Sequence, residues 1–102
     1  MSRELRWFHV QLALVGLSEK EALEALPYMQ TQFEMRQHLR GPRIYWVTGT
    51  KHAVFETELN DFDKERAAGW AEEDLYEVTV AAVADTANLG IERVDVREID
   101  TD

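Results

Sequence analysis

The chain has 102 residues, of which 45% are hydrophobic and 10% aromatic, as expected for one globular domain. Twenty acidic residues against eleven basic ones give a formal charge of −9, which argues against a partner with a phosphate backbone such as DNA or RNA. The chain has no cysteine, so disulfides, thiolate-bound metals and thiol nucleophiles are excluded.

No apolar run approaches the roughly 20 residues that a membrane span requires, and the N-terminus lacks the apolar core of a signal peptide. We therefore expect a cytoplasmic protein with no membrane partner, built as a single α+β domain over residues 1–102. The acidic charge favours solubility, and it also permits steering toward a basic protein.

Residues 5–15 alternate between two kinds of side chain, which predicts a β-strand. The face expected to point into the core is apolar and consists of Phe8, Val10, Leu12 and Leu14. The opposite face mixes aromatic, imidazole and amide groups, and it includes Trp7, His9 and Gln11. Such a mixed face is typical of one that is partly open or packed on a partner.

A helix is predicted to begin after Ser18, because Glu21 three residues later completes a capping box. Pro27 lies inside the helical pattern, so we expect a kink or a restart there. Residues 28–39 could be helix or strand: alternation from Met29 to Met35 fits a strand, whereas Gln, Glu, Met and Arg favour a helix from 30 to 40. We prefer the helix.

Residues 44–48 and 52–59 are rich in β-branched and aromatic side chains, and a short loop that contains Gly49 separates them. This pattern predicts a hairpin. Tyr45 and Trp46 are both plausible core residues, so the face of the first hairpin strand that is open stays undecided. The charged segment 60–69 has no clear period and is interpreted as an exposed loop with a possible helical turn.

The last third of the chain predicts one helix followed directly by one strand. Acidic residues at 72–74 indicate the helix start, two apolar stripes continue to Leu89, and Gly90 marks the stop. Apolar residues around more than one face indicate that the helix is covered on more than one face. In the strand over 91–99, Val94 and Val96 are expected to lie opposite the charged residues Arg93, Asp95 and Arg97.

These elements, in the order β-α-β-β-α-β, predict a ferredoxin-like two-layer sandwich with a four-stranded antiparallel sheet and both helices on one face. The other face of the sheet is then open. It is expected to collect Trp7, His9, Gln11, Glu56, Glu58, Arg93, Asp95 and Arg97.

The sequence contains no catalytic or cofactor motif. His9, His52 and the glutamates at 56 and 58 could be neighbours, but no spacing typical of metal ligands supports a metal site. Glu56 and Glu58 project the same way from one strand without a cleft, which is poor geometry for an acid–base pair. No catalytic residue, metal or cofactor is therefore predicted.

The residues expected to contribute to binding include the three tryptophans, because amphipathic aromatics are enriched at binding hot spots. The full set is Trp7, His9, Gln11, Trp46, His52, Glu56 and Trp70. Trp46 also fits ordinary core packing, and Trp70 is placed in a loop before the last helix.

The preferred hypothesis is a small, acidic, non-catalytic binding module that forms a homodimer through the open sheet face. One alternative is a small-molecule-binding domain or cofactor-independent enzyme, with a pocket near Trp7, His9 and Trp46 enclosed by two sheets. Another is an acidic immunity-like or antitoxin-like binder of a basic protein.

Overall fold

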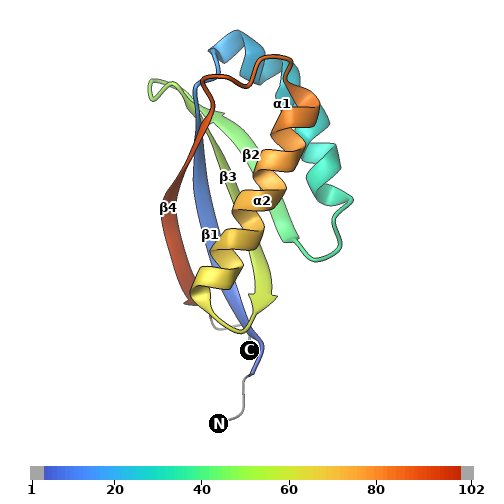
Figure 1. The fold of residues 1–102 in the computed structure, drawn as a ribbon, viewed down its shortest axis with the longest axis vertical. Helices are drawn as coiled ribbons and strands as arrows, with labels where there is room; N and C mark the ends of the chain where they lie inside the picture. Colours follow the sequence, from blue (N-terminus) through green and yellow to red (C-terminus); the bar gives the residue numbers. More distant parts are fainter. Residues whose placement is uncertain (1–3, 100–102) are drawn as a thin grey trace.

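The computed structural model describes residues 4–99, which form a sheet covered on one face by two helices (Figure 1). The elements are β1 (Arg6–Val15), α1 (Glu19–Glu34), β2 (Arg40–Val47), β3 (His52–Asp61), α2 (Lys64–Ala82) and β4 (Gly90–Ile99). The strands are antiparallel and lie in the order β2-β3-β1-β4. The predicted ferredoxin-like sandwich is confirmed.

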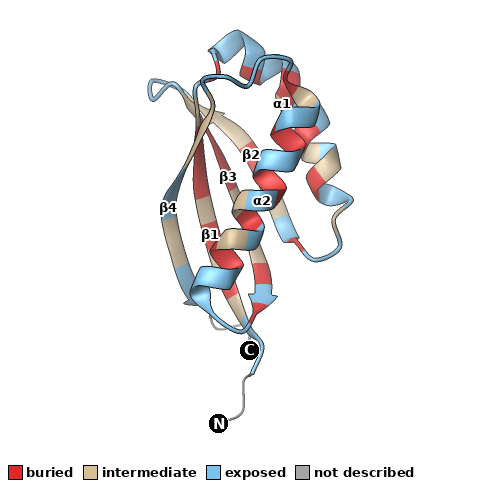
Figure 2. Ribbon diagram, viewed as in Figure 1, coloured by how far each residue is buried: buried red, intermediate tan, exposed pale blue. Residues whose placement is uncertain are grey.

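The core lies between the sheet and the helices, and the central strands β1 and β3 carry nearly all of the buried residues of the sheet (Figure 2). The four residues of β1 predicted to face inward are all buried. Phe33 of α1 stacks on Phe55 of β3, with ring centroids 4.2 Å apart, and so joins the two layers.

Helix α1 begins at the predicted capping box. The Ser18 hydroxyl accepts a hydrogen bond from the Glu21 N–H at 3.1 Å, and the Glu21 carboxylate accepts one from the Ser18 N–H at 3.2 Å. The helix continues through Pro27 to Glu34. The preferred helix is therefore confirmed over the alternative strand, whereas a restart at Pro27 and a continuation of the helix to residue 40 were wrong expectations. Pro27 is on the exposed side of the helix, where water can satisfy the carbonyl that loses its partner.

The hairpin is confirmed, and both of its strands are longer than predicted. β2 begins at Arg40 and β3 ends at Asp61. The register pairs Tyr45 with Val54 and Trp46 with Ala53, which places Tyr45 on the open face. Trp46 is half-buried and packs against the core on the helix side.

Helix α2 differs from the prediction at both ends. Asp63 is its N-cap, with its carboxylate accepting from the Arg66 N–H at 2.8 Å, and the helix ends at Ala82. The predicted loop over 60–69 and the predicted start near residue 71 were wrong, because the small buried residues Ala67 and Ala68 carry the core-facing side of the first turns. Val83 adopts extended backbone and is itself buried, which ends the helix before Leu89.

Strand β4 contains a bulge that overturns part of the predicted alternation. Gln11 pairs with Asp95 and Leu12 pairs with Arg93, so Val94 is an extra residue and is exposed. A bulge reverses the faces of the residues that precede it. Arg93 consequently lies on the helix side, not on the open face, and its guanidinium forms ion pairs with Glu65 and Glu72 of α2.

Those ion pairs raise the pKa of Arg93 above its usual value, first through the hydrogen bonds to Glu72 and then through the one to Glu65. The expectation of a fully covered last helix was also incomplete, since Trp70, Tyr76 and Val80 are exposed. Within residues 4–99, no helix combines the length and the apolar character needed to cross a membrane.

Candidate functional site

The open sheet face carries five of the seven residues predicted to bind, four of which lie near one another. Trp7, His9 and Gln11 lie on β1, and the register pairs His9 with Glu58 and Gln11 with Glu56 on β3. His52 is on the same face but at the far end of β3, opposite Val15. It is therefore separated from His9 by the length of the strand, and the two histidines do not form one site.

Glu56 is the centre of a hydrogen-bond network on this face. Its carboxylate accepts from the Tyr45 hydroxyl at 3.1 Å, from the Gln11 amide at 3.3 Å and from the Arg43 guanidinium at 3.3 Å. Desolvation by burial, together with the hydrogen bond to Glu56, raises the pKa of Tyr45. The network crosses three strands, so it fixes these side chains in one arrangement.

A second group on the open face is centred on Arg40, at the start of β2. Its guanidinium bonds the carboxylate of Glu58 at 2.7–2.8 Å and lies 3.7 Å from the centroid of the Trp7 ring. The register of β2 shifts between Arg40 and Arg43, at a Gly41 with a φ of +59°. Beside this irregularity is a hollow of about 230 Å³, lined by His9, Arg40, Gly41, Glu56, Thr57 and Glu58.

Charges of both signs are balanced over this half of the open face. We call this half of the face the charged rows, because it consists of two adjacent rows of side chains. Each row has one residue from every strand of the sheet. The charged rows consist of Arg40, Arg43, Glu56, Glu58, His9, Gln11, Asp95 and Arg97. They contain three arginines and three carboxylates, whereas the whole chain has a formal charge of −9. The acidic excess therefore lies elsewhere on the molecule.

Two of the predicted binding residues are not on the open face. Trp46 faces the helix layer, next to a hollow that Leu17 and Lys51 also line. A pocket that contains Trp7, His9 and Trp46 together is therefore not formed, because the sheet separates Trp46 from the other two. Trp70 is in α2 rather than in a loop, and 46% of its surface is exposed.

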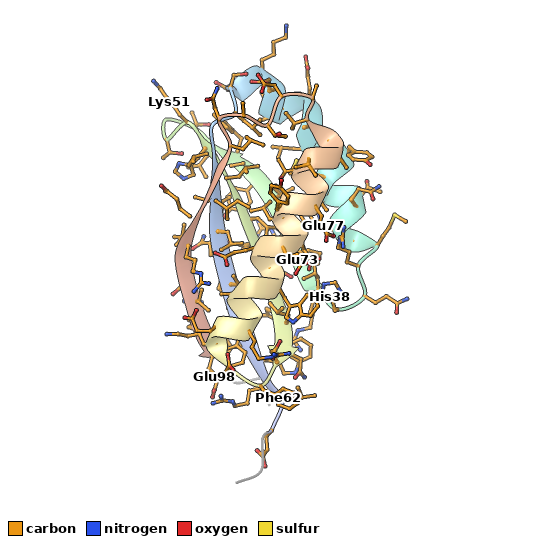
Figure 3. All side chains as sticks on the ribbon, viewed as in Figure 1. His38, Lys51, Phe62, Glu73, Glu77 and Glu98 are labelled. Carbon is orange, nitrogen blue, oxygen red and sulfur yellow. The ribbon has the colours of Figure 1, made fainter. Side chains whose placement is uncertain are left out.

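A second polar cluster, which the sequence analysis missed, joins α2 to the connection between α1 and β2. Asp74 is on the buried side of α2, with only 5% of its side chain exposed. Its Oδ1 accepts from Arg36 at 3.1 Å and its Oδ2 lies 2.5 Å from Nε2 of His38. Figure 3 shows His38 beside α2. Two partners compensate the burial of the carboxylate.

This cluster adjoins a cavity of about 220 Å³ at the C-terminal end of β3. The cavity is lined by His38, Leu59, Asn60, Asp61 and Trp70. The rings of His38 and Trp70 meet edge to face with centroids 6.3 Å apart. Among the cavity residues, Asp61 is buried and its carboxylate accepts from Arg66 at 2.9 Å. The imidazole, a carboxylate and an indole are thus grouped around one small space.

The sequence carries one signal that could have located this cluster. Asp74 shares the helical stripe of Ala71, Leu75 and Val78, all of which are buried. A carboxylate in an apolar stripe indicates a compensating partner. We interpreted Asp74 only as part of an acidic helix start, and nothing near His38 in the sequence indicates that it meets Asp74, 36 residues away.

Over residues 4–99, no three or more His, Asp or Glu side chains are grouped so that they could hold a metal ion. Comparison with protein-family models, with curated proteins and with solved structures gave no significant match.

Proposed function

We propose that the protein is a non-catalytic binding module that self-associates, with its open sheet face packed on the same face of a second copy. The charge balance of the charged rows carries this proposal. Because the acidic excess of the chain lies outside these rows, two copies that meet through them bring no net charge of the rows into the interface.

The dimensions of the sheet suit such an interface. Four strands spaced about 4.8 Å apart, each ten or fewer residues long at about 3.3 Å per residue, present a projected area of roughly 600 Å². A standard interface buries about 800 Å² of accessible surface per partner, and side-chain relief makes accessible area larger than projected area. Beyond the charged rows, Tyr45, Val47 and Val15 supply apolar contacts.

The distribution of charge favours one orientation of the two copies. A two-fold axis parallel to the strands places β2 of one copy over β4 of the other, and β3 over β1. Arg43 then faces Asp95 of the second copy and Glu56 faces Gln11, whereas Arg40 faces Arg97, so this axis makes one attractive and one repulsive contact between β2 and β4. An axis perpendicular to the strands would instead stack the basic side of β2 on itself and the acidic side of β3 on itself.

Molar mass from light scattering tests this arrangement by charge reversal. The wild type should have twice the 11.8 kDa mass of the chain, whereas Arg43→Asp and Asp95→Arg should each be monomeric. The double variant should be dimeric again. Positions 43 and 95 are on opposite edges of the sheet, roughly 14 Å apart, so the restored pair can form only between two copies.

Glu73→Arg is the matched control, because it changes the charge as much as Asp95→Arg does but lies on the exposed side of α2 (Figure 3). It should leave the dimer intact. Trp7→Ala, which removes the aromatic platform of Arg40, should weaken the dimer. A wild type that is monomeric at low and at high salt would contradict self-association. It would favour instead a basic protein as partner.

A further inference from the structure

We propose that the cavity between His38 and Trp70 is a binding site for a neutral, single-ring phenol, whose hydroxyl donates a hydrogen bond to Nδ1 of His38. The proposal does not depend on self-association, because the residues that line the cavity belong to the C-terminal end of β3, to α2 and to the connection between α1 and β2.

The volume of the cavity sets the size of the ligand. The hollow is open to solvent on one side, and its volume of about 220 Å³ exceeds the roughly 150 Å³ of a closed cavity that holds benzene, so one ring with a substituent has room there. Trp70 presents an exposed indole, and Leu59 adds an aliphatic wall. Aromatic pairs gain energy beyond simple burial of area, which favours an aromatic ring over an aliphatic chain of the same size.

The charges around the cavity favour a neutral ligand. Asp61 is compensated by the guanidinium of Arg66, and Asp74 by that of Arg36. The cavity therefore offers no uncompensated cation to a carboxylate or phosphate. It offers no uncompensated anion to an ammonium group.

His38 supplies the directional contact. Its Nε2 is engaged by Asp74, so in the neutral imidazole the proton is on Nε2 and Nδ1 carries the lone pair. Asp74 is buried and fixed by Arg36, which holds the ring in this orientation. Within residues 4–99, Nδ1 makes no hydrogen bond, and the His38 residue lines the cavity together with Trp70. A phenol can satisfy both features at once, whereas toluene has the same ring but no donor.

The test is a titration with phenol and with toluene, followed by NMR signals of the Trp70 indole and the His38 ring. It uses the wild type and the Arg43→Asp variant, so that failure of the dimer proposal does not affect the result. The wild type should bind phenol about tenfold more tightly than toluene, the ratio expected for one added hydrogen bond. His38→Leu should abolish this preference while toluene still binds, and Trp70→Leu should weaken both ligands.

Trp46→Leu is the matched control, because it removes an indole next to a different hollow and should change neither affinity. His38→Phe, which keeps an aromatic ring but has no acceptor, replaces His38→Leu if the latter does not fold, as judged by circular dichroism. Equal affinity for the two ligands, or a phenol preference that survives both His38 variants, would overturn the proposal. So would shifts confined to residues outside the cavity.

Discussion

The guanidinium of Arg40, on the edge strand β2, lies 3.7 Å from the ring centroid of Trp7, two strands away on β1. To reach it, Arg40 crosses β3, where it also pairs with Glu58. A planar guanidinium can stack on an indole and bond a carboxylate at the same time, whereas an ammonium group cannot reproduce both contacts. This one side chain therefore joins three strands on the open face.

Arg40→Lys should lower the free energy of unfolding by about 0.5–1 kcal/mol, because it retains the charge near Glu58 but loses the stacking on Trp7. Urea denaturation gives the difference. Lys20→Arg, on an exposed turn of α1, is the control for the exchange of one cation for the other. A neutral effect of Arg40→Lys would show that the stacking contributes nothing.

Tyr45 should make stability fall at alkaline pH. Its pKa is raised in the folded state above the ordinary 10.0, so the unfolded chain loses the proton first. The stabilisation is therefore complete below about pH 10 and is lost as the pH rises through the folded-state pKa. Urea denaturation of the wild type and of Tyr45→Phe between about pH 8 and about pH 11 measures the effect.

The difference in stability between these two proteins should be constant up to about pH 9 and should change only above about pH 10. Because lysines titrate in the same range in both proteins, only the difference between them reports Tyr45. A difference that is independent of pH would contradict the raised pKa.

Asp74→Asn should destabilise the protein by about 1–3 kcal/mol, because it removes a buried acceptor and leaves donors of Arg36 and His38 with a weaker partner. The adjacent and exposed Glu73→Gln should stay within about 0.5 kcal/mol of the wild type. Thermal or urea unfolding separates the two. Equal effects would mean that Asp74 has no structural role beyond that of a surface residue.

Gly16→Ala should be destabilising by more than about 1 kcal/mol. Gly16 has a φ of +101°, and a Cβ there would lie 2.1 Å from the carbonyl oxygen of Asn88. Gly69→Ala provides the opposite case, since Gly69 is within α2 and a Cβ there meets no atom within 4 Å. It should stabilise the protein by about 0.5–1 kcal/mol. Melting temperatures of both variants should therefore move in opposite directions.

The two-layer architecture, and most of the residues on the open face, could be predicted from the sequence. Apolar and polar residues alternate regularly in β1 and β3, which shows which side of each strand faces the helices. Phe8, Val10 and Leu12 point to the helices, so Trp7, His9 and Gln11 must point away. The start of α1 was predictable for a local reason, since the capping box involves residues only three positions apart.

The errors arose where a local pattern was overridden. In β4, the extra residue Val94 cannot be recognised from alternation, so Arg93 was placed on the wrong face. In the first turns of α2, the core-facing positions are occupied by alanines and not by the large apolar residues from which a helix is usually recognised. This part of the sequence therefore resembled a charged loop. The contact between His38 and Asp74 depends on tertiary packing, and no spacing within the sequence encodes it.

The irregularities in β2 and β4 have a consequence for how copies of the chain can join. These are the two edge strands of the sheet, and an unbroken edge is a template for the addition of further strands. β2 is interrupted at Gly41-Pro42, where proline has no N–H to donate, and β4 is interrupted at Val94. Both edges of the folded sheet thus disfavour the addition of further strands, which opposes growth of the sheet from edge to edge into fibrils.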